Sequence, residues 1–456
     1  MTSSSSPKDS LKRELMRRLL EARKDIPTSA IGRLGRTAAT ALRSGRLMLG
    51  ARGRADRAAS GAGEARETDI DIDEMARIVA SIGELKGIAM KAGQIMSYID
   101  VALPEELRDA LSVLQTHAQP MPIERVEGIL RDELGDRAAE LLRTLEPEPV
   151  AAASIGQVHR ARLADGTVVA VKVQYLNIER AIEADFGPAA VGTRLISLIY
   201  PNARADTFVR EARARFLEEC DYLHEAHYQR RFGAIFAAHP LLRVPAVHGG
   251  LCSRRVLTTT FVQGASFDAF LSGQPPQAVR DRIGEALFEF YIGTLFLGGL
   301  YNCDPHPGNY LFLPDGAVAM LDYGCTREFE PAFVAKLAAL TRAVHGDERD
   351  ALHRSFVDLG MVKDGQRYDF DTARGLVRAF YGPMLRAGTR EVDLGEVKSM
   401  RQVLDSKREL MKLGVPGEFL FLFRIRFGLM SVLARLGARA DWYELEQAYV
   451  SRGGPA

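Results

Sequence analysis

The chain has 456 residues, of which 46% are hydrophobic and 26% are charged. This composition is typical of a folded globular protein and excludes a wholly disordered or fibrous chain. The formal net charge of +1 argues against a protein whose whole surface is built to bind nucleic acid. The four cysteines lie far apart and form no CxxC pair, so the pattern argues against a zinc ribbon and a disulfide scaffold.

The charge is unevenly distributed, because residues 1–60 carry 14 Lys and Arg against 5 Asp and Glu. Arg33, Arg36, Arg43 and Arg46 recur at helical spacing beside apolar residues, which predicts a weakly amphipathic, Arg-rich surface. Two interpretations stay open: a solvated tail, or a segment that docks on an anionic membrane surface or on a partner. The sequence shows no secretory signal and no uncharged apolar run of about 20 residues. We therefore expect a cytoplasmic protein that is at most peripheral on a membrane.

The first 149 residues divide into two predicted regions. Residues 1–66 combine basic side chains with many Gly, Ser and Ala residues, which predicts a basic and flexible N-terminal region. In residues 67–149, apolar side chains recur every three to four positions between prolines, which predicts a helical extension. The last helical pattern of this extension runs over Ile123–Leu145.

The rest of the chain is predicted to form a small β-containing lobe, residues 150–262, and a mainly helical lobe, residues 263–456. In the first lobe, two β-rich runs flank Ala164-Asp-Gly and predict a hairpin. In the second, an apolar helix is expected at 277–300, followed by a Pro/Gly-rich loop and a hairpin that turns at Pro314-Asp-Gly.

Three short segments carry residue types that suit phosphoryl transfer. Lys172 ends the run Val-Ala-Val-Lys on a predicted strand. Asp304 and Asn309 are five residues apart in Asp-Pro-His-Pro-Gly-Asn, and Asp322 begins Asp-Tyr-Gly after the second hairpin. In kinases a strand Lys neutralises phosphates, an Asp orients or deprotonates the acceptor, and an Asn and a second Asp hold metal ions. Each segment alone is also typical of an edge strand or a turn, but their order favours a kinase-like site.

With further motifs in the same order, the chain resembles the UbiB (AarF) family of atypical kinase-like proteins, especially its mitochondrial coenzyme Q biosynthesis branch. Lys91-Ala-Gly-Gln94 matches the KxGQ motif, and Ala151-Ala-Ala-Ser154 followed by Ile-Gly-Gln-Val-His matches the alanine-rich nucleotide loop. Glu219-Cys-Asp followed by Tyr-Leu-His-Glu matches the ExD motif. The resemblance implies an α+β, protein-kinase-like two-lobe fold with a helical N-terminal extension, and it implies ATP and Mg²⁺ as ligands.

The resemblance also implies a role for each matched residue. Asp304 would be the catalytic Asp, and Lys172 would bind the phosphates and pair with Glu225. Asn309 and Asp322 would hold the metal. The nucleotide would be covered by Ala151, Ala152, Ala153 and Ser154. The adenine hinge would be formed by Thr259, Thr260, Phe261 and Val262. A helix that carries Lys91 and Gln94 would pack across the site against Glu219 and Asp221.

Alanine in place of glycine in a phosphate loop adds a methyl group and removes access to positive φ, which predicts slow phosphoryl transfer. The sequence departs from ordinary kinases at Asn302-Cys303, which stands before Asp304 where they have His-Arg, and no APE-like peptide-docking segment follows Asp322. A buried Glu219–Asp221 pair would need compensating charge, which Lys91 could supply; without Lys91 the pair could bind Mg²⁺.

The sequence therefore predicts a Mg-dependent ATPase or atypical kinase that supports isoprenoid-quinone or other lipid metabolism, with no nucleic-acid partner. An isoprenoid lipid or quinone precursor is the expected partner besides ATP, together with a peripheral membrane contact through the basic N-terminus. Three alternatives stay open: a protein kinase, a small-molecule or lipid kinase, and a nucleotide-binding scaffold without catalysis.

Overall fold

A computed structural model describes residues 120–153, 155–176, 178–180, 217–365, 367–393, 395 and 417–453. The chain forms two compact units. Unit 1 comprises Met1–Ala161, Val171–Cys220 and Arg254–Val256, and unit 2 comprises Arg162–Ala170, Asp221–Ser253 and Leu257–Ala456. The predicted basic region and most of the predicted helical extension, including Lys91 and Gln94, lie outside the described residues.

The helical pattern predicted at 123–145 forms two short helices separated by a single 3-10 turn. Helix α6 buries four apolar side chains at helical spacing, from Val126 to Leu134. It ends where Gly135 takes a φ of 58°, a backbone conformation that glycine adopts without steric cost. The elements are α6 (Ile123–Leu134), η2 (Gly135–Arg137) and α7 (Ala138–Leu142).

A four-stranded sheet has the strand order β1-β2-β3-β5. The predicted hairpin joins its two long strands: Leu163 N–H donates to Thr167 O at 2.9 Å, and Gly166 provides the positive φ of 88° that the tight turn requires. The strands are β1 (Ala151–Ala153), β2 (Gly156–Arg162), β3 (Val168–Gln174) and β5 (Val256–Thr260).

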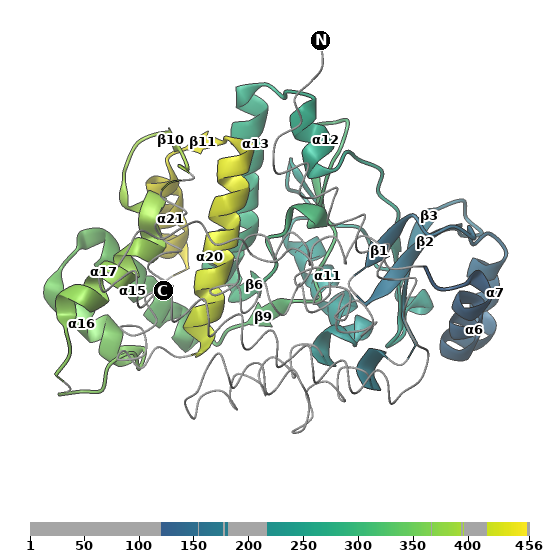
Figure 1. The fold of residues 1–456 in the computed structure, drawn as a ribbon, viewed down its shortest axis with the longest axis horizontal. Coiled ribbons are helices and arrows are strands. Elements are labelled where there is room, and N and C mark those ends of the chain that lie inside the picture. Colours follow the sequence, from purple (N-terminus) through teal and green to yellow (C-terminus); the bar gives the residue numbers. More distant parts are fainter. Residues whose placement is uncertain are drawn as a thin grey trace, which may run out of the picture. The chain divides into compact units, whose positions relative to one another are not determined.

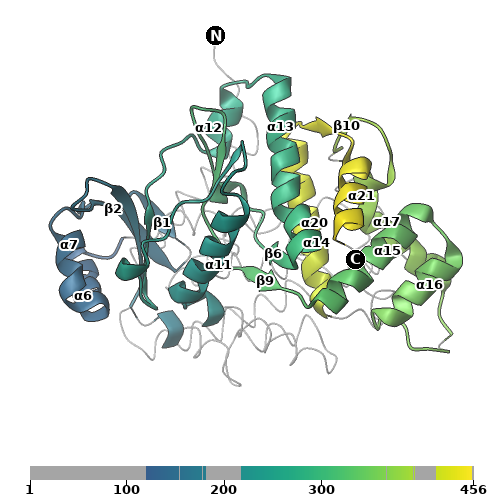
Figure 2. The ribbon, with the colours of Figure 1, turned by 180° about the vertical axis from the view of Figure 1, so that it is seen from behind.

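In the described part of unit 2 helices predominate, and one helical rod runs without interruption from Gln277 to Gly298. The rod consists of α13, a π-turn called η4, and α14, in place of the single regular helix expected at 277–300. Helix α13 packs beside α20, as both ribbon views show (Figures 1 and 2). The bounds are α11 (Tyr222–Ile235), α12 (Phe267–Ser272), α13 (Gln277–Phe288), η4 (Glu289–Gly293) and α14 (Thr294–Gly298).

Short strands of unit 2 form three small sheets. The second predicted hairpin is present as antiparallel β7 and β8, to which β4 adds in parallel. Strands β6 and β9 form a separate antiparallel pair, as do β10 and β11. The bounds are β4 (Leu242–Arg243), η3 (Gly249–Leu251), β6 (Leu300–Asn302), η5 (Pro307–Asn309), β7 (Tyr310–Phe312), β8 (Val318–Met320), β9 (Thr326–Glu328), β10 (Arg390–Glu391) and β11 (Arg439–Ala440).

The C-terminal helices complete a large apolar core that also takes in α13, η4, α14 and the β6–β9 pair. Trp442 and Leu433 are fully buried in this core. Across the described ranges, no helix has the length and apolar character needed to span a membrane. The remaining elements are α15 (Pro331–Gly346), α16 (Arg349–Asp358), α17 (Phe370–Tyr381), η6 (Gly382–Leu385), α20 (Gly417–Leu436) and α21 (Trp442–Arg452).

Candidate functional site

The β6–β9 pair brings the two predicted acidic segments together in unit 2. Strand β6 runs into Asp304, and β9 begins shortly after Asp322. Because the pair is antiparallel, both segments lie at the same end of it. The pairing continues one step beyond the strands, where Cys303 N–H donates to Cys325 O at 2.7 Å. Cys303 and Cys325, which are 22 positions apart in the sequence, are therefore neighbours.

One side chain, that of Asn302, ties these two segments to each other. Its Nδ2 donates to Asp322 O at 2.8 Å, and its Oδ1 accepts from Asp304 N–H at 3.0 Å. The residue is 2% exposed, so neither bond is exchanged readily for one to water. The sequence interpretation noted this position only as a departure from His-Arg. The signal it missed is that an amide carries both a donor and an acceptor.

The five-residue spacing between Asp304 and Asn309 closes a tight loop. A single 3-10 turn ends at Asn309, and His306 Nδ1 accepts from Gly308 N–H at 3.0 Å. Asn309 Nδ2 then donates to Asp304 Oδ2 at 2.9 Å and to Asp304 O at 3.2 Å. The amide nitrogen thus orients the Asp304 carboxylate, and the amide oxygen points away from it.

Buried tyrosines form the base of this loop. Tyr291 of η4 donates to Asp304 O at 3.3 Å, and its hydroxyl lies 3.0 Å from that of Tyr310. Burial raises the pKa of both phenols well above the ordinary value, and the Asp304 charge adds to the rise. Both side chains therefore stay neutral at physiological pH and act as fixed hydrogen-bonding groups.

Asp322 and Glu225 converge at Gly324. Gly324 N–H donates to Asp322 Oδ1 at 3.0 Å. A Cβ atom added to Gly324 would lie 3.5 Å from Asp322 Oδ1 and 3.5 Å from Glu225 Oε2. Burial raises the pKa of the intervening Tyr323, and the two negative charges raise it further. Both carboxylates therefore lie next to Gly324, where an added side chain would contact them.

Asp221, the Asp of the ExD segment, has a structural role as a helix cap. Asp221 Oδ1 accepts from Leu223 N–H at 2.9 Å and from His224 N–H at 3.4 Å, so it caps the N-terminus of α11. This cap fixes the start of the helix that carries the buried Glu225. Contacts of Asp221 and Glu219 with Lys91 stay a prediction, because Lys91 is outside the described part.

The predicted adenine hinge lies at the end of β5 in unit 2. Two of its backbone donors are already used: Thr260 N–H donates to Ala246 O at 2.8 Å, and Phe261 N–H donates to Val168 O at 2.9 Å. Within the described chain, Val262 N–H has no acceptor. Among the described residues, Val262 is therefore the one of these three whose backbone N–H is left over for the predicted adenine contact.

The chain beyond the predicted hinge runs beside the β7–β8 hairpin. Ala265 and Phe312 exchange backbone hydrogen bonds of 2.8 and 2.9 Å. A Cβ on Gly264 would lie 2.8 Å from Phe312 O, so glycine permits this close approach. Phe312 is three residues after Asn309, and the contact therefore links the predicted adenine side to the predicted metal side.

Unit 1 carries the other predicted nucleotide-binding residues. In β3 the valines at 169, 171 and 173 are fully buried, and the alternation of a strand places Lys172 on the opposite, half-buried face. Ala151, Ala152 and Ala153 form strand β1, paired with β2, where the sequence predicted a loop. Ser154 lies outside the described residues.

The motif residues after Ser154 hold the helical segment onto the sheet. Gln157 binds both backbone groups of Met121, through Oε1 at 2.6 Å and Nε2 at 3.1 Å. His159 Nδ1 donates to Glu146 O at 2.8 Å, so its Nε2 accepts from Gln157 Nε2. Both side chains are buried. Sequence reasoning gave them no role.

Replacing Asn302 with Ala should lower the free energy of unfolding by about 2–4 kcal/mol, because Asp322 O and Asp304 N–H lose their buried partner. Urea unfolding measures this change. Ser272→Ala is the control, since it removes a solvent-exposed bond to Asp268 O and should change stability by less than about 0.5 kcal/mol. Equal effects of the two variants would contradict the tethering role of Asn302.

Known proteins resemble this chain in sequence and in fold. The model of the ABC1 atypical kinase-like domain matches residues 113–355, more than half of the chain. The chain belongs to the ABC1 atypical kinase-like family. This assignment confirms both the predicted UbiB (AarF) membership and the predicted α+β, kinase-like fold.

Several ABC1 relatives are similar over long stretches. "Atypical kinase coq-8, mitochondrial" of Caenorhabditis elegans is 33% identical over 61% of this chain and 38% of the relative. "AarF domain-containing protein kinase 1" of Xenopus laevis is 26% identical, over 78% of this chain and 69% of the relative. The chain thus spans less than half of the worm protein.

A solved structure in the comparison is described as the complex of Rv3197 with erythromycin from Mycobacterium tuberculosis. It is 27% identical, with a TM-score of 0.59, and the match covers 82% of this chain and 95% of that one. The ABC1 fold is thus shared over nearly the whole length of a bacterial relative.

Proposed function

We propose that this ABC1 family member is a Mg-dependent ATPase or atypical kinase. The observation that carries the proposal is the hydrogen-bonded cluster of Asp304, Asn309 and Asp322, which Asn302 ties together at one end of the β6–β9 pair. These are the residue types, in the order, that phosphoryl transfer requires.

The donor set fits Mg²⁺ bound with a nucleotide. Mg²⁺ usually takes one or two oxygen ligands from the protein and the rest from phosphates and water. The amide oxygen of Asn309 and the carboxylate of Asp322 would supply those oxygens. When bound, the ion neutralises the charge that develops on the transferred phosphoryl group.

Asp304 would position the nucleophile, which is water in an ATPase or a hydroxyl group in a kinase. A bond forms between that oxygen and the γ-phosphorus while the bond from phosphorus to the β,γ-bridging oxygen breaks. The proton of the nucleophile passes to the Asp304 carboxylate, which Asn309 holds in place. Lys172 would bind the phosphates, and the Ala151–Ser154 segment would cover them.

Support of isoprenoid-quinone or other lipid metabolism is the biological role we propose, on the strength of the family membership. A lipid precursor is then the acceptor or the molecule whose handling the ATPase drives. Residues 1–66 would supply a peripheral membrane contact from the cytoplasm.

The test is incubation of the full chain with γ-labelled ATP and Mg²⁺, with and without lipid vesicles. Label released as phosphate supports the ATPase, and label on a lipid or peptide supports a kinase. Asp304→Asn should reduce turnover by about 100-fold or more. Nucleotide binding without turnover in the wild-type chain would contradict the enzyme proposal and favour a scaffold.

A further inference from the structure

A glycine of the C-terminal helix α20 lies directly against the catalytic loop. A Cβ atom placed on Gly428 would lie 2.5 Å from Pro305 Cγ and 3.6 Å from both Pro305 Cβ and Cδ. The proline ring is closed on its own backbone, so it is not able to swing aside as a long side chain does. Pro305 follows Asp304 directly, so a shift of this ring would move the predicted catalytic carboxylate.

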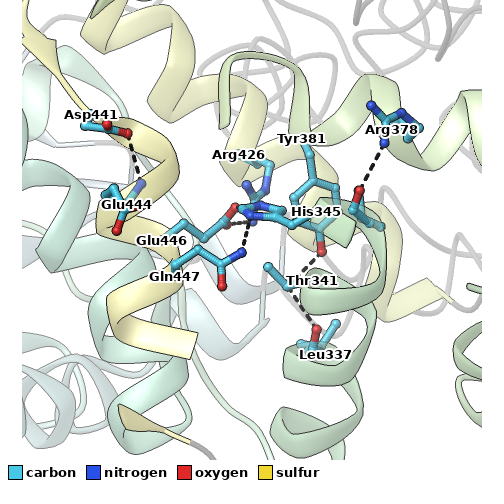
Figure 3. A network of polar contacts seen from close by, with 11 residues as sticks. Leu337, Thr341, His345, Arg378, Tyr381, Arg426, Asp441, Glu444, Glu446 and Gln447 are labelled. Atoms are coloured by element: carbon cyan, nitrogen blue, oxygen red, sulfur yellow. Dashed lines mark hydrogen bonds and ion pairs between the residues drawn. The ribbon is translucent and has the colours of Figure 1, made fainter. Parts of the chain in front are cut away.

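Helix α20 is fixed in place by a buried ionic network (Figure 3). Arg426, two residues before Gly428, donates to Glu446 Oε1 of α21, and His345 Nε2 of α15 lies 2.9 Å from Glu446 Oε2. The Arg426 guanidinium also lies over the Tyr381 ring, 4.3 Å from its centre. Glu446 is fully buried. Arg426 thus contacts α21 and α17 directly, and Glu446 links it to α15, so the network holds α20 in place beside the loop.

The same network reaches the strand that leads into the loop. Burial raises the pKa of Tyr301 on β6, and the nearby Arg426 charge opposes that rise. Tyr301 precedes Pro305 by four residues. The direct contact between this segment and α20 is the one at Pro305, and the buried ionic network anchors α20 two residues away from it.

We propose that Gly428 is a positioning residue, which lets α20 seat Pro305 and thereby sets the place of the Asp304 carboxylate. The inference rests on the ATP-dependent activity proposed above. It gives the distant α15, α20 and α21 helices a part in catalysis without any contact to the nucleotide.

The test compares Gly428→Ala with Gly375→Ala. Both glycines lie inside helices, where alanine is favoured by about 1 kcal/mol, but a Cβ on Gly375 meets nothing within 4 Å. Gly428→Ala should lower kcat for ATP about 10- to 100-fold with KM for ATP nearly unchanged, because a small displacement of a catalytic group is costly. Gly375→Ala should keep wild-type values.

A second variant separates positioning from general damage. Pro305→Ala removes the ring carbon that the new methyl group would strike. The Gly428→Ala/Pro305→Ala double variant should therefore recover kcat to within about threefold of Pro305→Ala alone. A loss that Pro305→Ala does not relieve, or a Gly428→Ala enzyme with normal kcat, would overturn the proposal. If Gly428→Ala alone does not fold, the proposal still requires that the Gly428→Ala/Pro305→Ala double variant folds and has a kcat within about threefold of that of Pro305→Ala.

Hydrogen exchange gives a readout that does not depend on turnover. In Gly428→Ala, the peptide that covers residues 302–309 should exchange faster, while α17 should be unchanged. Exchange identical to the wild type would contradict the contact. A wild-type chain that turns over no ATP would contradict the proposed function, and the exchange rates would still decide whether Gly428 positions the loop.

Discussion

Asp322→Asn should weaken the binding of Mg-ATP by about 100-fold, or about 2.7 kcal/mol, and leave adenosine binding within about twofold. Asparagine keeps the oxygen that accepts from Gly324 N–H but loses the charge that the metal requires. Isothermal titration with Mg-ATP and with adenosine measures both affinities. The fold should be retained, since the backbone bond to Gly324 remains possible.

Asp315→Asn is the matched control for this experiment. Asp315 Oδ1 accepts from Ala317 N–H at 3.0 Å, two residues ahead, just as Asp322 accepts from Gly324 N–H. It stands at the turn of the β7–β8 hairpin, where no metal role is proposed. Equal losses of Mg-ATP and adenosine affinity in Asp322→Asn would show that Asp322 is structural and is not a metal ligand.

Glu446→Ala should lower the free energy of unfolding by about 3–5 kcal/mol, because it leaves the buried Arg426 without its carboxylate. Urea unfolding measures the change. Glu127→Ala is the control, since its ion pair with Arg131 is largely exposed and should contribute less than about 1 kcal/mol. Similar effects of the two substitutions would contradict the anchoring role of the network.

The network also predicts how stability depends on pH. Burial alone would raise the pKa of Glu446, but the charges of Arg426 and His345 outweigh it and hold the pKa below the ordinary value. The carboxylate therefore contributes stability above the unfolded-state pKa of about 4.3, and this contribution is lost as pH falls through the lowered pKa. Glu446→Gln should flatten the acid limb of the stability curve.

Local sequence patterns were sufficient for the two hairpins and for the order of the catalytic segments. Ala164-Asp-Gly and Pro314-Asp-Gly each supply the glycine that a tight turn requires, so both turns were predictable from short range alone. The five-residue spacing between Asp304 and Asn309 likewise favoured a kinase-like site, and the structure adds that the two side chains are bonded to each other.

Local sequence patterns did not predict the contacts between residues that are far apart in the sequence. The role of Arg426 was not predicted, because its partner Glu446 is 20 residues away on another helix. Asn302 and Gly428 were missed for the same reason. Their effects depend on Asp322 and Pro305, which only the folded chain brings within contact.

The π-turn between α13 and α14 connects the winding of the 277–298 rod to the Asp304 loop. Tyr291 lies in that turn and donates to Asp304 O. Deleting a single residue from Glu289–Gly293 would convert the π-turn into regular α-helical winding and remove the extra residue that the wider turn accommodates, so Tyr291 would lose its present place beside Asp304 O. Such a deletion should therefore alter the base of the Asp304 loop even though no side chain of the loop itself is changed.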